Sequence, residues 1–122
     1  MLRRLLLASA VLGAALAAAA VGTAGTRAVP KLTGEDGPGF TIEVKLAGKD
    51  VKTLKAGTYT IVVEDKASIH NFHLIGRGVN KATSVAFVGK KTWTVKLKPG
   101  SYTYQCDVHA ASGMKGKFRV TA

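Results

Sequence analysis

Residues 104–120 read YQCDVHAASGMKGKFRV and contain the only cysteine of the chain, Cys106. His109 follows three residues later, and Met114 follows five residues after that. Thiolate, imidazole and thioether are soft donors, a combination that suits copper better than other common biological metals. A pattern typical of strands precedes the ligand loop at residues 101–106 and follows it at residues 117–121. The sequence therefore predicts a metal-ligand loop between the last two strands.

Further strands are predicted upstream of this loop by apolar alternation and by glycine and proline turns. They cover residues 40–46, 58–64, 69–75, 83–88 and 92–98. Phe40, Ile42, Val44 and Leu46 are expected on one inward face, Trp93 is expected in the core, and the glycine-rich residues 34–39 are expected to form a loop. About seven short strands at this spacing indicate an all-β fold, an antiparallel Greek-key β-sandwich.

The beginning of the chain has the pattern of a secretory signal peptide. Arg3 and Arg4 precede a run of apolar, alanine-rich sequence that ends near Val21. We expect residues 1–24 to be removed, and cleavage after Ala28 is an alternative. A second alternative is that the segment is retained as a membrane anchor. Residues 29–122 then form one exported domain, periplasmic or extracellular and without stable membrane insertion, of a size that allows a single core.

The chain is strongly basic, with 18 lysines and arginines against 7 acidic residues and a formal net charge of +11. The lysines are scattered, and no aromatic residues alternate with them as they do in proteins that bind single-stranded nucleic acid. We therefore expect no nucleic-acid partner. A transient redox partner with an acidic surface fits this charge better, and the domain is expected to be a monomer.

A loop as short as residues 106–114 cannot surround a metal ion by itself, so a further ligand must come from elsewhere. His70 and His73 are the other histidines of the chain. In a regular strand, two residues separated by an odd number point to opposite faces, so only one of these histidines should reach the metal. A single cysteine also cannot form an internal disulfide, and a metal bond would protect its thiol in an oxidising compartment.

Two motifs together resemble the blue-copper cupredoxins, in particular plastocyanin and small secreted azurin-like proteins. They are Ser68-Ile-His70-Asn71-Phe72 upstream and Cys106-x-x-His109-x-x-x-x-Met114 downstream. In that family the upstream ligand is the histidine followed by asparagine, which selects His70 and leaves His73 as a structural or surface residue. The resemblance implies His70, Cys106 and His109 as equatorial copper ligands, Met114 as the weak axial ligand, and Asn71 as the residue that steadies the ligand loop.

The resemblance implies one-electron transfer by a type 1 copper ion that cycles between Cu(I) and Cu(II). A secreted copper-binding or copper-delivery protein is the main alternative, and a metal-free interaction module is another. Zinc is disfavoured, because structural zinc sites have more thiolates and no thioether. An enzyme is not expected, since four protein ligands leave no position for a substrate.

Overall fold

The computed structural model describes residues 28–122, so the predicted signal peptide, residues 1–24, lies outside the described part. Among the described residues, no helix is long and apolar enough to cross a membrane. The elements are β1 (Lys31–Asp36), β2 (Ile42–Leu46), β3 (Lys49–Asp50), β4 (Thr53–Lys55), β5 (Gly57–Asp65), β6 (His73–Gly76), β7 (Val79–Ala82), β8 (Gly89–Leu97), β9 (Gly100–Gln105), the 3-10 helix η1 (Ala110–Ser112) and β10 (Lys115–Thr121).

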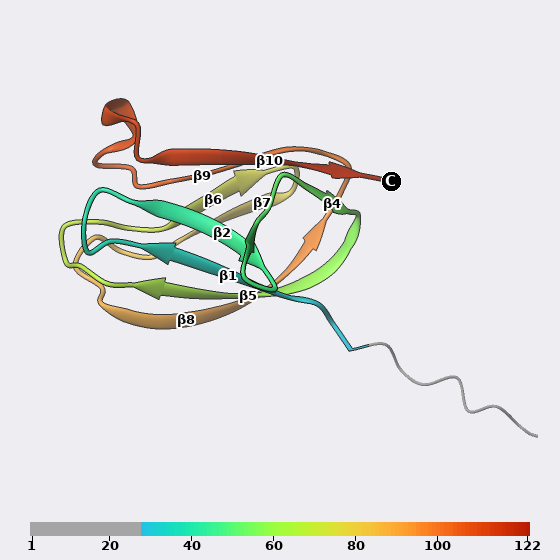
Figure 1. Ribbon diagram of the computed structural model, residues 1–122, viewed down its shortest axis with the longest axis horizontal. Coiled ribbons are helices and arrows are strands. Elements are labelled where there is room, and N and C mark those ends of the chain that lie inside the picture. The colour runs from blue at the N-terminus through green and yellow to red at the C-terminus, as the bar shows by residue number, and fades with distance from the viewer. Residues whose placement is uncertain (1–27) are drawn as a thin grey trace, which may run out of the picture.

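The strands form two sheets that pack face to face, as Figure 1 shows, so the predicted β-sandwich is confirmed. The first sheet has the order β3-β2-β1-β5-β8, and the second has the order β4-β10-β9-β6-β7. The pairing is not purely antiparallel as expected, because β1 runs parallel to β5 and β4 runs parallel to β10. In each parallel pair the two strands are separated in sequence by several other strands. The intervening chain is long enough to form the crossover connection that parallel pairing requires.

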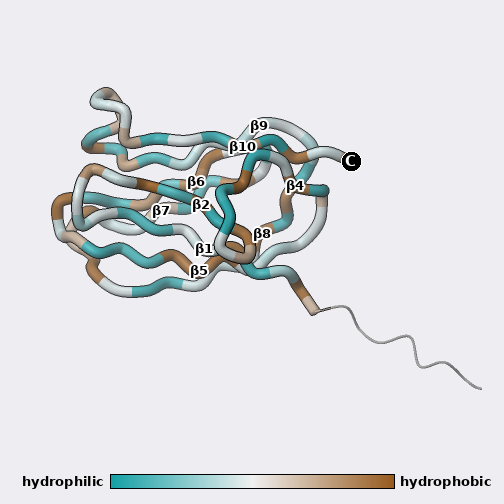
Figure 2. Tube along the Cα trace, in the orientation of Figure 1, coloured by the Kyte–Doolittle hydropathy of each residue, from teal (hydrophilic) through white to brown (hydrophobic). Residues whose placement is uncertain are grey.

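The core lies between the sheets and takes side chains from both. Hydrophilic and hydrophobic residues alternate along the strands in Figure 2, as expected where one face of each sheet is buried. Each fully buried aliphatic or aromatic side chain stabilises the fold by roughly 1.5–3 kcal/mol. The buried core residues are Leu32, Val44, Val51, Leu54, Tyr59, Ile61, Val63, Phe72, Leu74, Val79, Val95, Leu97, Tyr102, Phe118 and Val120.

The prediction of a loop at residues 34–39 is wrong for its first half, because Gly34 lies within β1. Gly34 faces the core, and a Cβ atom added there would lie 2.7 Å from Cζ of Phe72. Phe72 is fully buried, so its ring could move aside only by disturbing its neighbours in the core. Glycine at this position therefore makes room for the Phe72 ring, which lies just before β6 of the opposite sheet, and the turn that glycine suggested begins only after Asp36.

Two further predictions are also wrong. Residues 83–88 form no strand; Thr83 is buried, and a turn follows in which the Phe87 N–H donates to the Ser84 carbonyl at 3.1 Å. Phe40 does not join the inward face of β2, because its side chain is 66% exposed. Both errors have one cause: β-branched and aromatic residues suit strands, but their contacts to distant residues override that preference.

The remaining strands are placed as predicted, with small differences at their ends. Residues 40–46 shorten to β2, residues 58–64 extend to β5, and residues 92–98 correspond to β8. Trp93 is partly buried and packs against the core, with its ring centre 6.3 Å from that of Phe72. Of residues 69–75, only those from His73 onward form a strand, so His70 lies in the connection between β5 and β6.

Candidate metal centre

Three connections that are distant in sequence meet at one end of the sandwich, on the left of Figure 1. They are the β1–β2 loop, the β5–β6 connection with His70, and the β9–β10 connection, which begins at Cys106 and ends at Met114. Because β1, β5 and β9 all finish at this end, the residues that follow them come close together. The fold thus unites the two predicted motifs.

Backbone hydrogen bonds hold the ligand loop in a fixed shape. The Cys106 N–H donates to the Met114 carbonyl at 3.0 Å, and the His109 N–H donates to the Cys106 carbonyl at 3.1 Å. The Met114 N–H donates to the His109 carbonyl at 3.2 Å, after Gly113 has turned the chain with a φ of 96°. Glycine accepts this left-handed conformation without strain. The loop therefore returns Met114 to the level of Cys106.

The ligand atoms of His70, Cys106 and His109 form a compact triangle. The two Nδ1 atoms of His70 and His109 are 3.0 Å apart, and Sγ of Cys106 lies 3.8 Å from Nδ1 of His70 and 3.5 Å from Nδ1 of His109. The point equidistant from the corners of such a triangle lies about 2 Å from each of them, close to the ~2.0–2.3 Å bonds that first-row metal ions form with imidazole and thiolate. The triangle thus has the size of a trigonal metal site.

The predicted ligands differ in exposure. His70 and Cys106 are fully buried, Met114 is 3% exposed, and His109 is half-buried. Met114 is fixed at the site by its backbone bonds to Cys106 and His109. Nε2 of His70 has no hydrogen-bond partner among residues 28–122, so the ring is oriented by packing and by its Nδ1 side. His109 is accordingly the ligand closest to solvent.

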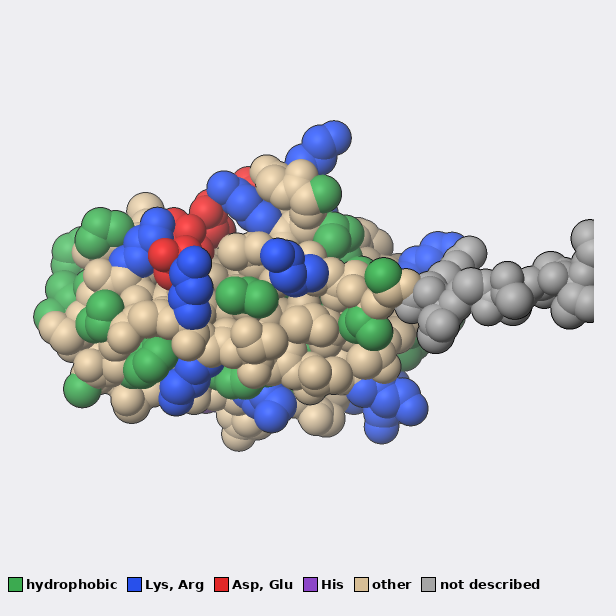
Figure 3. Space-filling view, turned by 90° about the horizontal axis from the view of Figure 1, so that it is seen from below, with side chains coloured by type: hydrophobic (Ala, Val, Ile, Leu, Met, Phe, Trp, Pro, Cys, Tyr) green, Lys and Arg blue, Asp and Glu red, His purple; other side chains and the backbone are tan. Residues whose placement is uncertain are grey.

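Phe40 covers the two ligand histidines, a role that its sequence position did not reveal. Its ring meets His109 edge to face at a centroid distance of 4.8 Å and meets His70 at 5.4 Å. Ile69 and Val108, the residues just before the two histidines, are 53% and 56% exposed. Figure 3 shows hydrophobic side chains gathered at this end of the molecule. The site therefore opens towards an apolar surface.

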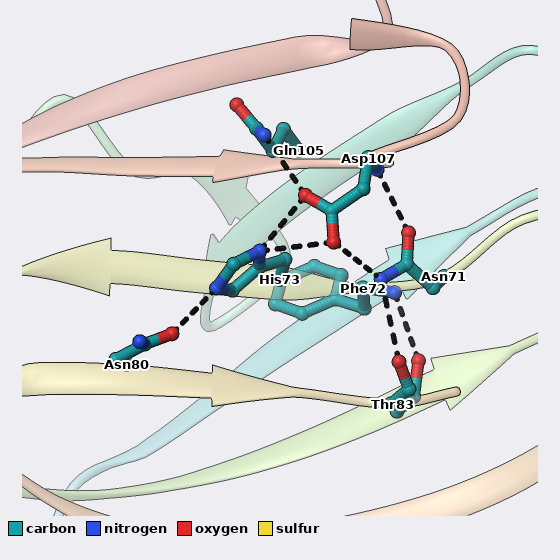
Figure 4. Close-up of polar contacts among 7 residues, drawn as sticks. All are labelled: Asn71, Phe72, His73, Asn80, Thr83, Gln105 and Asp107. Carbon is teal, nitrogen blue, oxygen red and sulfur yellow. Dashed lines mark hydrogen bonds and ion pairs between the residues drawn. The ribbon is translucent and has the colours of Figure 1, made fainter. Parts of the chain in front are cut away.

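Asn71 and Asp107 connect the two halves of the site, as Figure 4 shows. The Asp107 N–H donates to Oδ1 of Asn71 at 2.8 Å, and Nδ2 of Asn71 donates to Oδ2 of Asp107 at 2.9 Å. Asn71 follows His70 and Asp107 follows Cys106, so this two-point contact fixes the distance between the two ligand segments. Asn71 was expected in this role from the family resemblance, whereas Asp107 was not foreseen.

His73 lies beside the site and is not part of the ligand triangle. Its Nδ1 is 2.8 Å from Oδ1 of Asp107, and its Nε2 is 2.6 Å from Oδ1 of Asn80 (Figure 4). Two acceptors require two N–H groups, which only the protonated imidazole provides. Partial burial would lower the pKa of His73, but these contacts with Asn80 and Asp107 outweigh burial and raise it above the usual value.

The carboxylate of Asp107 is stabilised in its charged form. Burial would raise its pKa, but hydrogen bonds from Gln105, Asn71 and His73 outweigh that effect and hold the pKa below the usual value. Gln105 contributes through Nε2, 2.9 Å from Oδ1 of the aspartate. A charged and fully bonded Asp107 is a firm anchor for the backbone next to Cys106.

The donor set distinguishes between metals. One thiolate, two imidazoles and one thioether are the ligands of a trigonal copper site with a weak axial donor, whereas zinc prefers tetrahedral sites without thioether. The buried Cys106 is the only cysteine, so no second thiolate is available. The residues therefore fit copper.

No family model matches the chain. Among solved structures, rusticyanin from Thiobacillus ferrooxidans is 25% identical, with 75% of this chain and 76% of that chain covered and a TM-score of 0.54. A methionine-to-glutamine mutant of rusticyanin is 23% identical, with the same coverage of each chain and a TM-score of 0.57. Dithionite-reduced auracyanin from the photosynthetic bacterium Roseiflexus castenholzii is 22% identical, with 80% of this chain and 100% of that chain covered and a TM-score of 0.53.

Rusticyanin and auracyanin are blue-copper cupredoxins, so the fold expected from the two sequence motifs is confirmed. The present chain is a cupredoxin-fold protein, and at one end of its sandwich His70, Cys106, His109 and Met114 are arranged as a metal site.

Proposed function

We propose that this protein binds one copper ion through His70, Cys106, His109 and Met114 and carries single electrons between redox partners. The observation behind the proposal is the triangle of two Nδ1 atoms and one Sγ atom, with sides of 3.0, 3.5 and 3.8 Å. Rusticyanin, which shares the fold, is a copper protein. Copper would supply a one-electron couple between Cu(I) and Cu(II).

The protein would contribute rigidity. Cys106 and Met114 are joined by a backbone hydrogen bond, and Asn71 and Asp107 join the His70 segment to the Cys106 segment. Ligands held in this way keep their positions when the charge of the site changes. Small rearrangement favours fast electron transfer over catalysis, and a site with four protein ligands offers no place for a substrate. The proposal is therefore for a carrier and not an enzyme.

Electrons would enter and leave at His109, the half-buried ligand. Its ring lies under Phe40 and next to Val108, so a partner can approach it across apolar surface. Contacts of this kind are small and short-lived, which suits rapid turnover. The basic charge of the chain favours a partner with an acidic surface.

We further propose that the protein is exported and works in the periplasm or outside the cell. Residues 1–24 have the signal-peptide pattern. In an oxidising compartment a lone thiol would be exposed to oxidation, and the complete burial of Cys106 within a metal site would protect it.

The test is to add Cu(II) to the purified apo-protein and record the visible spectrum. We expect an intense thiolate-to-copper charge-transfer band that is lost in Cys106→Ser. His70→Gln and His73→Gln form a matched pair, because the histidines are three residues apart: the first variant should lose the band and the second should keep it. A colourless wild type, or a band that survives Cys106→Ser, would overturn the proposed site.

Electron transfer is tested separately from copper binding. We expect reversible one-electron oxidation and reduction in voltammetry, with the copper retained when a soluble chelator is added. Transfer of the copper to the chelator within minutes, without reversible voltammetry, would instead support copper delivery.

A further inference from the structure

The acidic residues are distributed unequally between the two sheets. Among residues 28–122, every aspartate or glutamate within a strand belongs to the first sheet, β3-β2-β1-β5-β8. Two of these acids are paired, Glu43 with Lys45 at 3.0 Å and Glu35 with Lys66 at 2.7 Å. Figure 3 shows acidic side chains directly beside lysines or arginines on the face in view. Acidic side chains therefore stand among the lysines of the first sheet.

The strands of the second sheet carry basic residues and no acidic ones. Lys115, Lys117 and Arg119 are exposed at alternate positions of β10, so their side chains share its outer face. Residues at alternate positions of a strand lie about 6.6 Å apart. None of the three forms an ion pair with any residue in the described part of the chain. We call Lys115, Lys117, Arg119 and the exposed Lys52 the basic strip.

Neutral hydrogen-bonding side chains border the basic strip on β9. Gln105 pairs in register with Lys115, Thr103 with Lys117, and Ser101 with Arg119. Two hollows follow this boundary and share Lys117. One is lined by Thr103, Gln105, Lys115, Gly116 and Lys117, and the other by Lys52, Ser101, Lys117, Phe118 and Arg119. Each hollow combines cationic groups with a hydroxyl group, a combination that suits a carboxylate, while the Gln105 amide in the first hollow already donates to Asp107 at 2.9 Å.

We propose that the basic strip is the surface on which an acidic redox partner docks, with carboxylates of the partner seated in the two hollows. The inference rests on the proposed electron-transfer function and identifies the face that the partner uses. The strip begins at Lys115, directly after the ligand Met114, so a partner bound along β10 also reaches the end of the molecule where His109 lies.

The chemistry of the strip favours a protein partner over nucleic acid. The aromatic residues of β9 and β10 point inward: Tyr102 and Phe118 are buried, and Tyr104 is packed on the core. The strip therefore offers no stacking surface for bases. Carboxylates on alternate residues of a partner strand would be spaced ~6.6 Å apart, like the charges of the basic strip. Arginine also binds a carboxylate through two parallel hydrogen bonds.

The experiment is an NMR titration of the ¹⁵N-labelled full chain with a heptaglutamate peptide, which stands for the acidic surface. We expect amide shifts at residues 101–105 and 115–119. In Lys117→Gln/Arg119→Gln the peptide should bind about fivefold more weakly, the loss expected for two exposed ion pairs. The control Lys90→Gln/Lys96→Gln removes the same charge from exposed positions of β8 and should bind as wild type does.

Three outcomes would overturn the inference. The shifts could map to the first sheet, or both double variants could weaken binding equally, which would mean that only net charge matters. In the third outcome, an octathymidylate would bind the strip more tightly than the peptide does, which would point to nucleic acid. These shifts do not depend on bound copper, so failure of the docking surface is distinguishable from failure of the copper site, which the visible band reports.

Discussion

Two carboxyl groups near the metal centre, Asp107 and Asp36, have opposite environments. Asp107 accepts hydrogen bonds from Asn71, His73 and Gln105, and its pKa is lowered. Asp36 is fully buried, neither of its carboxylate oxygens has a hydrogen-bond donor within residues 28–122, and its pKa is raised to about 7. The difference shows that a carboxylate stabilises a ligand loop only where donors surround it; without them, burial favours the protonated acid.

Burial is the main cause of the raised pKa of Asp36, and Asp65 adds to it. The two residues are paired in register on β1 and β5, and Asp65 is also buried. Once protonated, Asp36 can donate a hydrogen bond to Asp65, whereas two charged carboxylates would repel one another. Burial and this neighbour therefore both favour the protonated form of Asp36.

The largest expected effect is a decline in stability with rising pH, caused by Asp36. Below pH 3.8 this carboxyl is protonated in both states, while from there to about pH 7 only the unfolded chain releases the proton. The free energy of unfolding should therefore fall by up to ~1.4 kcal/mol per pH unit in this range. Urea denaturation at several pH values measures the slope.

Asp36→Asn serves as the control for that slope, because an amide cannot ionise. Its stability should be nearly independent of pH between 4.5 and 7, and above pH 7 it should exceed that of the wild type. Equal slopes in the two proteins would refute the assignment to Asp36.

Thr83 connects the two carboxyl environments and should give the next largest effect. Its hydroxyl donates to Asp65 at 3.2 Å and accepts from the Phe72 N–H at 2.9 Å, and its carbonyl accepts from Asn71. Thr83→Val leaves buried groups unpaired and should cost about 2–3 kcal/mol. Thermal or urea unfolding measures the loss; Thr83→Ser retains the hydroxyl and should lose less than half as much. Similar losses in both variants would indicate packing as the cause.

Replacement of Asp107 should have a moderate effect on stability and a visible one on the metal site. Asp107→Ala removes the hydrogen bonds from three donor side chains, but the aspartate side chain is 41% exposed, so the expected cost is about 1–2 kcal/mol. Because the backbone next to Cys106 then keeps only one of its two bonds to Asn71, the charge-transfer band should shift in wavelength. Asp107→Asn keeps one acceptor oxygen and should shift the band less; an unchanged spectrum in Asp107→Ala would contradict the anchoring role.

The smallest effect is expected for His73, and its size depends on pH. The raised pKa means that protonated His73 stabilises the fold fully below pH 6.5, and this contribution is lost as the pH rises through the raised value. His73→Gln should cost up to about 1 kcal/mol at pH 5.5 and almost nothing at pH 9, as measured by urea denaturation. An equal cost at both values would show that protonation plays no part.

The candidate ligands could be chosen from the sequence because their signal is local. Cys106, His109 and Met114 lie on one loop, and the asparagine after His70 separates that residue from His73. Asp107 and Phe40 could not be found in this way. Their roles depend on contacts with Asn71 and with the ligand histidines, which only the folded chain brings near.

Strands were predicted correctly where apolar and polar residues alternate, as in β5 and β8. The prediction failed where a residue is placed by its contact with a residue distant in sequence. Gly34 resembled a turn residue because its purpose, space for Phe72, is not visible along the chain. Thr83 resembled a strand residue, but its hydroxyl and backbone bind Asp65 and Phe72. The parallel pairs β1–β5 and β4–β10 were likewise missed, since pairing direction depends on how the chain crosses between sheets.

The contact between Gly34 and Phe72 offers a means of tuning the metal centre from a strand that carries no ligand. Phe72 directly follows Asn71, which is bonded to Asp107, so displacement of its ring would be transmitted to both ligand segments. A single methyl group at position 34 would supply that displacement. Redesign of the metal centre could therefore begin in β1, on the opposite side of the core, with every candidate ligand left unchanged.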